Sequence, residues 1–246
     1  MLKIGAKSMR AIERLATILE AVASSPHPVA PTAVMGSTGL SLSTAARLMQ
    51  QLAEASLLTR DSHSGTYTLG PRVFAIAHAG MHQFGLRTRA RSILERLRDR
   101  SGETATLHIR AGSQRICIDQ VPSNHSHARL ITVGSAHPLI GSATGDVLLA
   151  YAAAPERERL IASLGVGDPE PSAVQGDIER TVSKGYSLSV NRWAQGVVSV
   201  AAPVLVKDIA VGALAVSGPV DRFTAERASA FAPELVAAAS ELAAGS

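Results

Sequence analysis

The sequence is poor in cysteine and in long apolar runs, and each shortage excludes a class of structure. The 246 residues include a single cysteine, Cys117, so no disulfide can form within the chain. No apolar run approaches the roughly 20 residues that span a bilayer, and the first residues lack the features of an export leader. We therefore expect a soluble, cytoplasmic protein.

Aromatic residues are also scarce, at 3% of the chain, and the charge is unevenly distributed. Residues 1–101 contain 13 Lys and Arg against 6 Asp and Glu, a formal charge of +7, whereas residues 102–246 contain 11 against 14, a charge of −3. The basic half suits a polyanionic partner, because neutralising phosphates supplies much of the binding energy. With few aromatic rings to stack on unpaired bases, double-stranded DNA is favoured over single strands or RNA.

The stretch from Gly39 to Gly70 combines an amphipathic helical pattern with two short strand-like runs. Apolar residues repeat with helical spacing at Ala45, Leu48, Met49 and Leu52. Polar residues occupy the opposite side at Ser43, Arg47, Gln50 and Glu54. Ser41 can cap this helix, and residues 57–60 and 66–69 flank a polar, glycine-containing loop, which predicts a hairpin. A helix followed by a hairpin is the outline of a winged helix.

Two further helices are predicted before this unit. A first apolar stripe consists of Ile12, Leu15, Ala16, Leu19 and Val22, and the helix should end at the serines and prolines of residues 24–28. Residues 32–37 can form a second, short helix, with Thr38 and Gly39 as the turn into the third. Residues 1–70 are therefore predicted to be a winged helix-turn-helix domain.

Residues 71–85 are interpreted as a linker helix. Pro71 can occupy the first turn of a helix over residues 72–79, and Gly80 and Gly85 then interrupt the pattern. A new helical stripe starts at Leu86, and its other positions hold six arginines: Arg87, Arg89, Arg91, Arg96, Arg98 and Arg100. We interpret these arginines as a solvated face of the second domain, in preference to a DNA-contacting arm.

The pattern becomes mixed in residues 86–246. Strand-like runs at 105–109, 115–121 and 129–133 precede helical stretches at 144–153, 155–163 and 177–184. A hairpin of residues 197–206 and 211–217 turns at Lys207 and Asp208, and residues 224–244 form a terminal helix. Pro203 should lie at a strand edge or bulge. This order predicts an α+β fold, with an antiparallel sheet covered by helices.

Several motifs together resemble the isocitrate-lyase-regulator (IclR) family of bacterial transcription factors. Residues 8–12, 38–48 and 65–71 look like its N-terminal signature, and residues 185–186, 196–204 and 213–219 look like its effector-domain signature. The resemblance implies a winged-helix DNA-binding domain, a linker helix and a GAF-like C-terminal α/β domain that binds a small effector. It also implies pairing through the N-terminal and linker region, and often tetramers through the effector domains.

The expected DNA contacts lie on the third helix and the hairpin. The polar N-terminal positions of a recognition helix enter the major groove, where Arg can bond guanine and Gln adenine. We predict DNA contacts from Ser41, Ser43, Thr44, Arg47, Gln50, Arg60 and His63. Ordinary solvated side chains are the alternative at each position. Because a single winged helix reads few base pairs, we expect a homodimer or homotetramer on a near-palindromic operator.

The expected effector site lies at the start of the helix after Gly141. Free backbone N–H groups at Ser142, Ala143 and Thr144 favour an anion such as a carboxylate. The resemblance adds Leu130, Ser189, Ser199 and Ser217 as pocket walls, for which packing inside the sheet is the alternative. Asp146 stands where a basic residue is common in the family, and residues 189–192 lack the acidic residues often found there. The identity of the effector therefore cannot be transferred.

Neither a metal site nor a catalytic site is predicted, and no cofactor is expected. The histidines at 125, 127 and 137, with Cys117 and Asp119, do not match zinc-ligand spacing. The Gly141–Gly145 stretch reads G-S-x-x-G, which differs from the G-x-S-x-G of a nucleophile elbow. Trp193 either covers the pocket or packs. An enzyme built on the second half and a ligand-independent DNA-binding protein remain as alternatives to an effector-controlled regulator.

Overall fold

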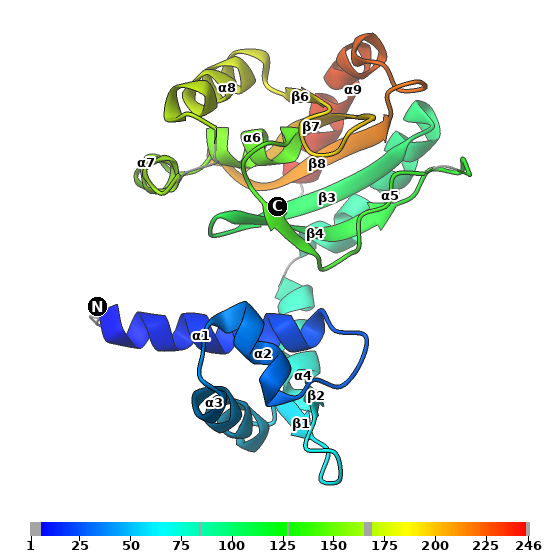
Figure 1. Ribbon diagram of the computed structural model, residues 1–246. Coiled ribbons are helices and arrows are strands. Elements are labelled where there is room, and N and C mark those ends of the chain that lie inside the picture. The colour runs from blue at the N-terminus through cyan, green and yellow to red at the C-terminus, as the bar shows by residue number, and fades with distance from the viewer. Residues whose placement is uncertain (1–5, 84, 127, 165–168, 245–246) are drawn as a thin grey trace. The chain divides into compact units, whose positions relative to one another are not determined.

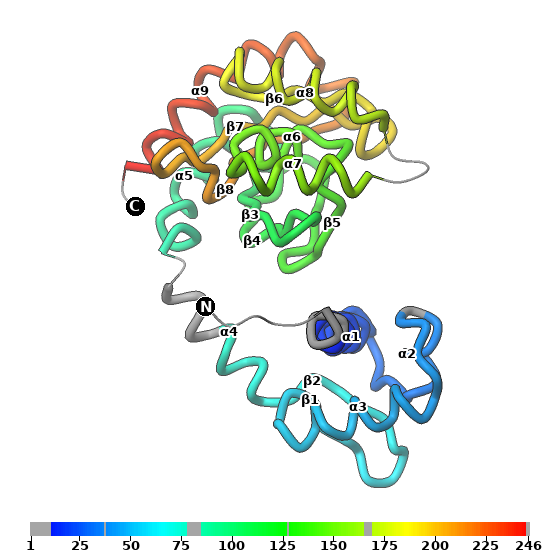
Figure 2. The backbone as a smooth tube through the Cα atoms, turned by 90° about the vertical axis from the view of Figure 1, so that its left-hand side faces the viewer, coloured from blue at the N-terminus to red at the C-terminus, as the bar shows by residue number. Residues whose placement is uncertain are grey.

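The computed structural model describes residues 6–83, 85–126, 128–164 and 169–244, and it divides into two compact units. The first unit ends at Gln83 and the second begins at Phe84. Figure 1 shows that the first unit is mostly helical and that the second is built around a sheet. Figure 2 follows the backbone of each unit from a second direction.

The first unit contains a three-helix bundle, a hairpin and a fourth helix. Its elements are α1 (Ala6–Ala23), α2 (Pro31–Thr38), α3 (Leu42–Glu54), β1 (Leu58–Arg60), β2 (Tyr67–Leu69) and α4 (Pro71–Gln83). Its core gathers one or more residues from nearly every element, among them Ile18, Val34, Met49, Leu58 and Tyr67. The predicted winged helix is therefore present, and burial of this shared core holds its small elements together.

Two local predictions in this unit were wrong. Ile12 is 55% exposed and Ala16 is exposed, whereas Ile18 is fully buried. The buried stripe of α1 thus runs through Leu15, Ile18, Leu19 and Val22. Helix α4 also continues through Gly80, because an isolated glycine weakens a helix without necessarily ending it.

The second unit is a six-stranded antiparallel sheet with helices on both faces. Its helices are α5 (Gly85–Ser101), α6 (Ala143–Ala150), α7 (Ala154–Ala162), α8 (Pro171–Lys184) and α9 (Ala225–Ala244). The strands are β3 (Thr104–Ala111), β4 (Gln114–Val121), β5 (Ala136–Pro138), β6 (Ser187–Val190), β7 (Val197–Val206) and β8 (Ile209–Pro219). They lie in the order β5-β4-β3-β8-β7-β6. Helices α5 and α9 pack on one face, and α6 and α8 on the other (Figure 1).

Most predicted elements of this unit are present, with two exceptions. Residues 129–133 are irregular, and the strand at this place is the shorter β5. The backbone N–H of Ile131 donates to the side-chain carbonyl of Gln120 and not to a strand ladder, and Leu130 and Val133 are both exposed. The sequence pattern also missed β6. As expected, Lys207 and Asp208 form the β7–β8 turn, both with positive φ, a combination that suits a two-residue hairpin turn.

Pro203 lies next to the irregularity in the β7–β8 pairing, between Val204 and Leu205. The pairing of β6 with β7 ends at Ala201, so no β6 residue faces Pro203. The missing N–H of Pro203 therefore interrupts no ladder on that side.

Candidate functional site

The polar N-terminal half of α3 is displayed on the surface of the first unit. Ser41 is the N-cap, and its Oγ accepts from the backbone N–H of Thr44 at 3.4 Å. The Ser41 Oγ also lies 3.2 Å from the Ser43 Oγ and 2.9 Å from the Thr44 Oγ1. Ala45, Met49 and Leu52 anchor the opposite side in the core. A short cluster of hydroxyl groups is thus presented at a helix N-terminus, where the macrodipole favours phosphate.

Arg47 and Gln50 continue this exposed face but differ in how strongly their side chains are already hydrogen-bonded. The Arg47 guanidinium makes one long contact, 3.5 Å to the Gln51 Oε1, and is otherwise exposed. Gln50 accepts from the Tyr67 hydroxyl at 3.5 Å and donates to Glu54 at 3.3 Å. Gln50 would have to exchange these partners to meet a base edge, whereas Arg47 would not.

The wing tip between β1 and β2 is ordered by one carboxylate. The Asp61 Oδ1 accepts from the backbone N–H groups of His63 and Ser64 and from the Ser64 hydroxyl, at 2.8–3.0 Å. These bonds, with the backbone bond from Ser64 foremost, lower the pKa of Asp61. Arg60 and His63 are both exposed on this loop. The wing therefore presents one cationic and one imidazole side chain from a defined turn.

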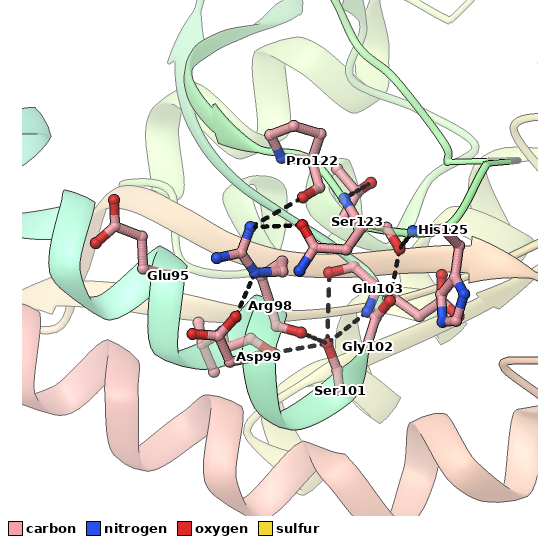
Figure 3. Close-up of polar contacts among 12 residues, drawn as sticks. Glu95, Arg98, Asp99, Ser101, Gly102, Glu103, Pro122, Ser123 and His125 are labelled. Carbon is pink, nitrogen blue, oxygen red and sulfur yellow. Dashed lines mark hydrogen bonds and ion pairs between the residues drawn. The ribbon is translucent and has the colours of Figure 1, made fainter.

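The arginines of α5 pair with acidic residues of their own unit. Ion pairs join Arg87 and Arg91 to Asp119, Arg96 to Glu241, Arg98 to Asp99 and Arg100 to Glu234. Arg98 also donates to the carbonyl of Pro122 at 3.3 Å (Figure 3). These partners fit the interpretation of α5 as a charged, structural face.

A small, partly open cavity lies on the α6 face of the second unit. Strand pairing explains its hydroxyl-rich wall: Ser189 of β6 lies opposite Ser199 of β7, which lies opposite Ser217 of β8. The Ser217 hydroxyl donates to the Ser199 Oγ at 2.8 Å. The start of α6 adds Ser142, Ala143 and Thr144 to the same cavity.

Helix α6 can approach this wall closely because of Gly145. The Ser142 Oγ caps the helix by accepting from the Gly145 N–H at 3.1 Å. A Cβ at position 145 would lie 1.5 Å from the Leu139 carbonyl oxygen, so no larger residue fits there. The cap leaves the first N–H groups of α6 without an intrahelical partner, which is the usual arrangement for binding an anion.

The remaining wall of the cavity is basic and aromatic. It includes Arg115 of β4, His108 of β3, and Arg129, Ile131 and Trp193 from irregular segments. A register shift between Leu107 and His108 leaves Ile118 of β4 unmatched, since Asp119 pairs with Leu107 and Cys117 with His108. Such a bulge reverses the facing of the strand. It therefore places Arg115 in the cavity wall, while Val121 faces the α5–α9 core.

Arg115 is a buried cation without an acidic partner among the residues the structure describes. It is 2% exposed, its Nε makes no hydrogen bond, and its guanidinium carbon stacks 4.6 Å from the centre of the Trp193 ring. Burial lowers the pKa of Arg115 to about 10, so the group remains charged at pH 7. Burial raises the pKa of the neighbouring Cys117 thiol to about 11, so that thiol supplies no negative charge.

His108 is buried beside Arg115 and is uncharged. Burial lowers its pKa to about 3, and Arg115 and His137 act in the same direction. Its Nε2 lies 3.1 Å from the Thr106 hydroxyl, while its Nδ1 is buried without a partner. His137 packs edge-on against Trp193, with ring centres 5.1 Å apart. Among the described residues, the Nε of Arg115 and the Nδ1 of His108 in the cavity wall thus have no hydrogen-bond partner.

The segment that carries Trp193 is fixed by an ion pair. Arg192 donates to Asp146 of α6 at 2.7 Å and to Asp177 of α8 at 2.8 Å, and the Ser187 hydroxyl also donates to Asp146. Burial raises the pKa of Asp146, and the pairing with Arg192 opposes that shift. Asp146 and the segment at residues 189–192 are the two departures from the family pattern. They are joined by one ion pair, between Asp146 on α6 and Arg192 on the loop.

Six of the seven predicted effector residues line this single cavity, and Leu130 does not. Leu130 is 59% exposed, while its neighbours Arg129 and Ile131 line the cavity. The sequence interpretation missed Arg115, His108, Thr106 and Arg129. The available signal for Arg115 was a positively charged residue directly before the apolar residues Ile116 and Cys117 of a predicted strand.

Other predicted absences concern metals and membranes. Among the described residues, no three His, Cys, Asp or Glu side chains lie close enough to hold a metal ion, and no helix is both long and apolar enough to cross a membrane. His127 lies outside the described residues. The backbone of His125 donates to the Ser123 hydroxyl in the segment after β4 (Figure 3).

Comparison with known protein families gives a match for each of the two units. Residues 11–62 match the model of the IclR helix-turn-helix domain, and residues 78–244 match that of the bacterial transcriptional regulator IclR C-terminal domain. The chain belongs to the IclR family. It is thus a transcriptional regulator with a helix-turn-helix DNA-binding domain and an IclR effector-binding domain.

Individual IclR-family relatives resemble the chain over nearly its whole length. The HTH-type transcriptional regulator BhcR of Paracoccus denitrificans is 29% identical, with 96% of this chain and 87% of that protein covered. The glycerol operon regulatory protein of Streptomyces griseus is 28% identical, with 97% and 95% covered.

Solved structures share the fold. An IclR-family transcriptional regulator from Brucella abortus superposes with a TM-score of 0.79 at 23% identity, covering 100% of this chain and 97% of that one. An IclR homologue from Microbacterium hydrocarbonoxydans, complexed with 4-hydroxybenzoate, gives a TM-score of 0.74 at 20% identity, with 96% and 99% covered.

Proposed function

We propose that this regulator binds a near-palindromic operator through α3 and the wing, and that a small carboxylate in the second unit alters its DNA affinity. The observation on which this rests is the pairing of two features in one chain. One is a hydroxyl-rich helix N-terminus with an exposed Arg47, braced by a packed core. The other is a cavity whose described lining contains two arginines and no acidic residue.

The DNA contacts follow from exposure and hydrogen-bond capacity. Ser41, Ser43 and Thr44 can donate to phosphate oxygens, and Arg47 can reach two acceptors of one guanine. Gln50 is a secondary contact because Tyr67 and Glu54 already engage it. Arg60 and His63 on the wing are assigned to phosphate or the minor groove.

The effector contacts follow from the electrostatics of the cavity. An uncompensated buried cation is unfavourable, and an anion that reaches it removes the penalty. Ser142, Ala143, Thr144, Ser189, Ser199 and Ser217 supply the donors that orient a carboxylate. The structural relative from Microbacterium hydrocarbonoxydans is complexed with a carboxylate, 4-hydroxybenzoate, which is consistent with this class of effector.

Pairing of two chains through the N-terminal and linker region is implied by the family resemblance, and exposed apolar side chains are available on α1 and α4. Ile12 of α1 is 55% exposed and Ile76 of α4 is 58% exposed. We assign α1 and α4 to a two-fold interface, in which two copies of α3 read two half-sites about one helical turn apart.

Genome-wide mapping of binding sites, followed by gel shifts with the recovered fragments, tests this function. We expect one or a few fragments with dyad symmetry to bind far more tightly than random duplex at moderate ionic strength. Adding a panel of small carboxylates should then change that affinity. Equal binding to selected and random duplex, with and without cell extract, would overturn the proposal.

A further inference from the structure

The cavity contains two separate kinds of anion-binding group, and they lie on different strands. One is the start of α6 together with the Ser199–Ser217 pair on β7 and β8. The other is Arg115 on β4, with Arg129 beside it. Strands β3 and β8 lie between β4 and β7 in the sheet, so the two groups approach the same cavity from different strands.

The charge of the cavity is not balanced by any single carboxylate. Arg115 and Arg129 both line it, and no acidic side chain does so among the described residues. The positive charge of Arg129 also acts on Arg115, lowering its pKa further after burial. One carboxylate would neutralise the charge of one guanidinium group and leave the charge of the other uncompensated in the cavity wall.

Apolar side chains line the same cavity beside these groups. Ile131, Ala194 and Val197 contribute aliphatic surface, and the Trp193 ring covers the Arg115 guanidinium. A compact dianion such as phosphate has no use for that surface. A ligand with two carboxylates joined by a short hydrocarbon chain matches both the charged groups and the apolar lining.

We propose that the effector is a short-chain dicarboxylate, with one carboxylate held by α6 and the serines and the other by Arg115 and Arg129. This assignment rests on the proposed function of the cavity as the effector site, and it specifies the chemical class of the ligand. It also assigns Arg129 a role in ligand selection.

The chain provides its own reporter, because Trp193 is its only tryptophan and stacks on Arg115. The full-length protein is titrated with malonate, succinate and glutarate, with propionate, butyrate and pentanoate as partners of equal chain length, and with inorganic phosphate. We expect at least one dicarboxylate to change the Trp193 fluorescence with an affinity about tenfold or more above that of its matched monocarboxylate. Phosphate should bind more weakly than that dicarboxylate.

Variants separate the two ends of the site. Arg129→Gln, at a half-buried position, should reduce the preference for dicarboxylate to about twofold or less while monocarboxylate affinity stays unchanged. Arg115→Lys keeps the charge and should retain part of the preference. Arg159→Gln on α7, at an exposed position outside the cavity, is the control and should bind as the parent does.

Three results would overturn the inference. They are equal affinity for matched mono- and dicarboxylates, tighter binding of phosphate than of every dicarboxylate, and no response to any dicarboxylate at about 10 mM, a concentration above that of weak specific ligands. If monocarboxylates still alter DNA binding, the proposed function stands while the dicarboxylate assignment fails. If no carboxylate of either class alters DNA binding, the proposed effector class fails as well.

Discussion

The buried Arg115 guanidinium lowers the stability of the folded unit and can also bind an anion. An ionised group in the interior is unfavourable by several kcal/mol unless it is paired. Stacking on Trp193 offsets about 2 kcal/mol of this cost, the value for a desolvated cation–π contact. An anion bound beside Arg115, as we propose, would relieve the remainder of this cost. On that proposal, the side chain that destabilises the unliganded unit is also the one that contributes binding energy to the ligand.

His108 predicts how stability changes with pH. Its pKa of about 3 in the folded chain lies below the ordinary value of 6.5, so the unfolded chain binds the proton more readily. Stability from this group is full above about pH 6.5 and is lost as the pH falls toward 3, at up to roughly 1.4 kcal/mol per pH unit. Urea denaturation at several pH values, followed by Trp193 fluorescence, should show this slope.

The variant His108→Gln should flatten that slope, since glutamine does not titrate. His63→Gln, at an exposed position on the wing, is the matched control and should leave it unchanged. An unaltered slope in the His108 variant would show that other groups cause the acid sensitivity.

Arg47 is the position where the loss of one side chain should affect DNA binding most specifically. Arg47→Ala removes a bidentate donor and is predicted to weaken operator binding by about 1–3 kcal/mol, roughly fivefold to 150-fold. The thermal midpoint should stay the same, because the side chain makes only one long contact. Gel shifts at fixed salt measure the effect, with Arg180→Ala in the second unit as control. Unchanged operator affinity would remove Arg47 from the contact surface.

At the scale of elements, the first unit was predictable because its signals are local. The α3 stripe, the Ser41 cap and the glycine-containing hairpin each depend on residues a few positions apart. The wrong stripe on α1 arose because Ile12 and Ile18 both suit a helical face. Only the packing against the other helices selects Ile18.

The effector site was only partly predictable because its basic wall depends on a non-local feature. The serines and the start of α6 lie within motifs that the resemblance identified. Arg115 reaches the cavity because of the bulge at Ile118, which no sequence period reveals. Arg129 lies in a segment with the β-type composition of a strand but without a pairing partner. Tertiary structure thus determined the half of the site that the sequence pattern did not show.

The turn between α2 and α3 is predicted to depend on its backbone geometry. Gly39 has φ +63, and a Cβ added at this position would meet no atom within 4 Å, so only the backbone conformation disfavours another residue. Gly39→Ala should lower the free energy of unfolding of the first unit by about 1–2 kcal/mol. Gly39→Asn should cost less, because asparagine tolerates the left-handed region.

Gly36→Ala provides the matched control for this turn. Gly36 lies inside α2 with equal space around it and without a positive φ. Alanine there should stabilise the helix by about 0.5–1 kcal/mol. Thermal unfolding followed by circular dichroism compares the three variants. Equal effects of alanine at positions 36 and 39 would contradict the proposed role of the turn.

At the scale of the whole molecule, the two units divide the work of a regulator. The first half of the sequence is basic and the second is acidic overall, so only the first is suited to lie along DNA. A ligand in the second unit can change DNA binding only if it prefers one arrangement of the assembled protein over another. In the proposed mechanism the assembly is therefore part of the switch, and its interface is the feature to test.

Ile76 is predicted to be essential for that assembly. A charge on this exposed face of α4 would have to be desolvated in the interface, so Ile76→Glu should shift the protein toward monomers in sedimentation velocity. Binding to a two-half-site operator should then fall by about tenfold or more, since each winged helix alone reads too few base pairs. Affinity for a single isolated half-site should not change, because α3 and the wing are intact. Val182→Glu on α8, an exposed valine of the second unit, is the control. A dimeric Ile76→Glu protein with full operator affinity would exclude α4 from the interface.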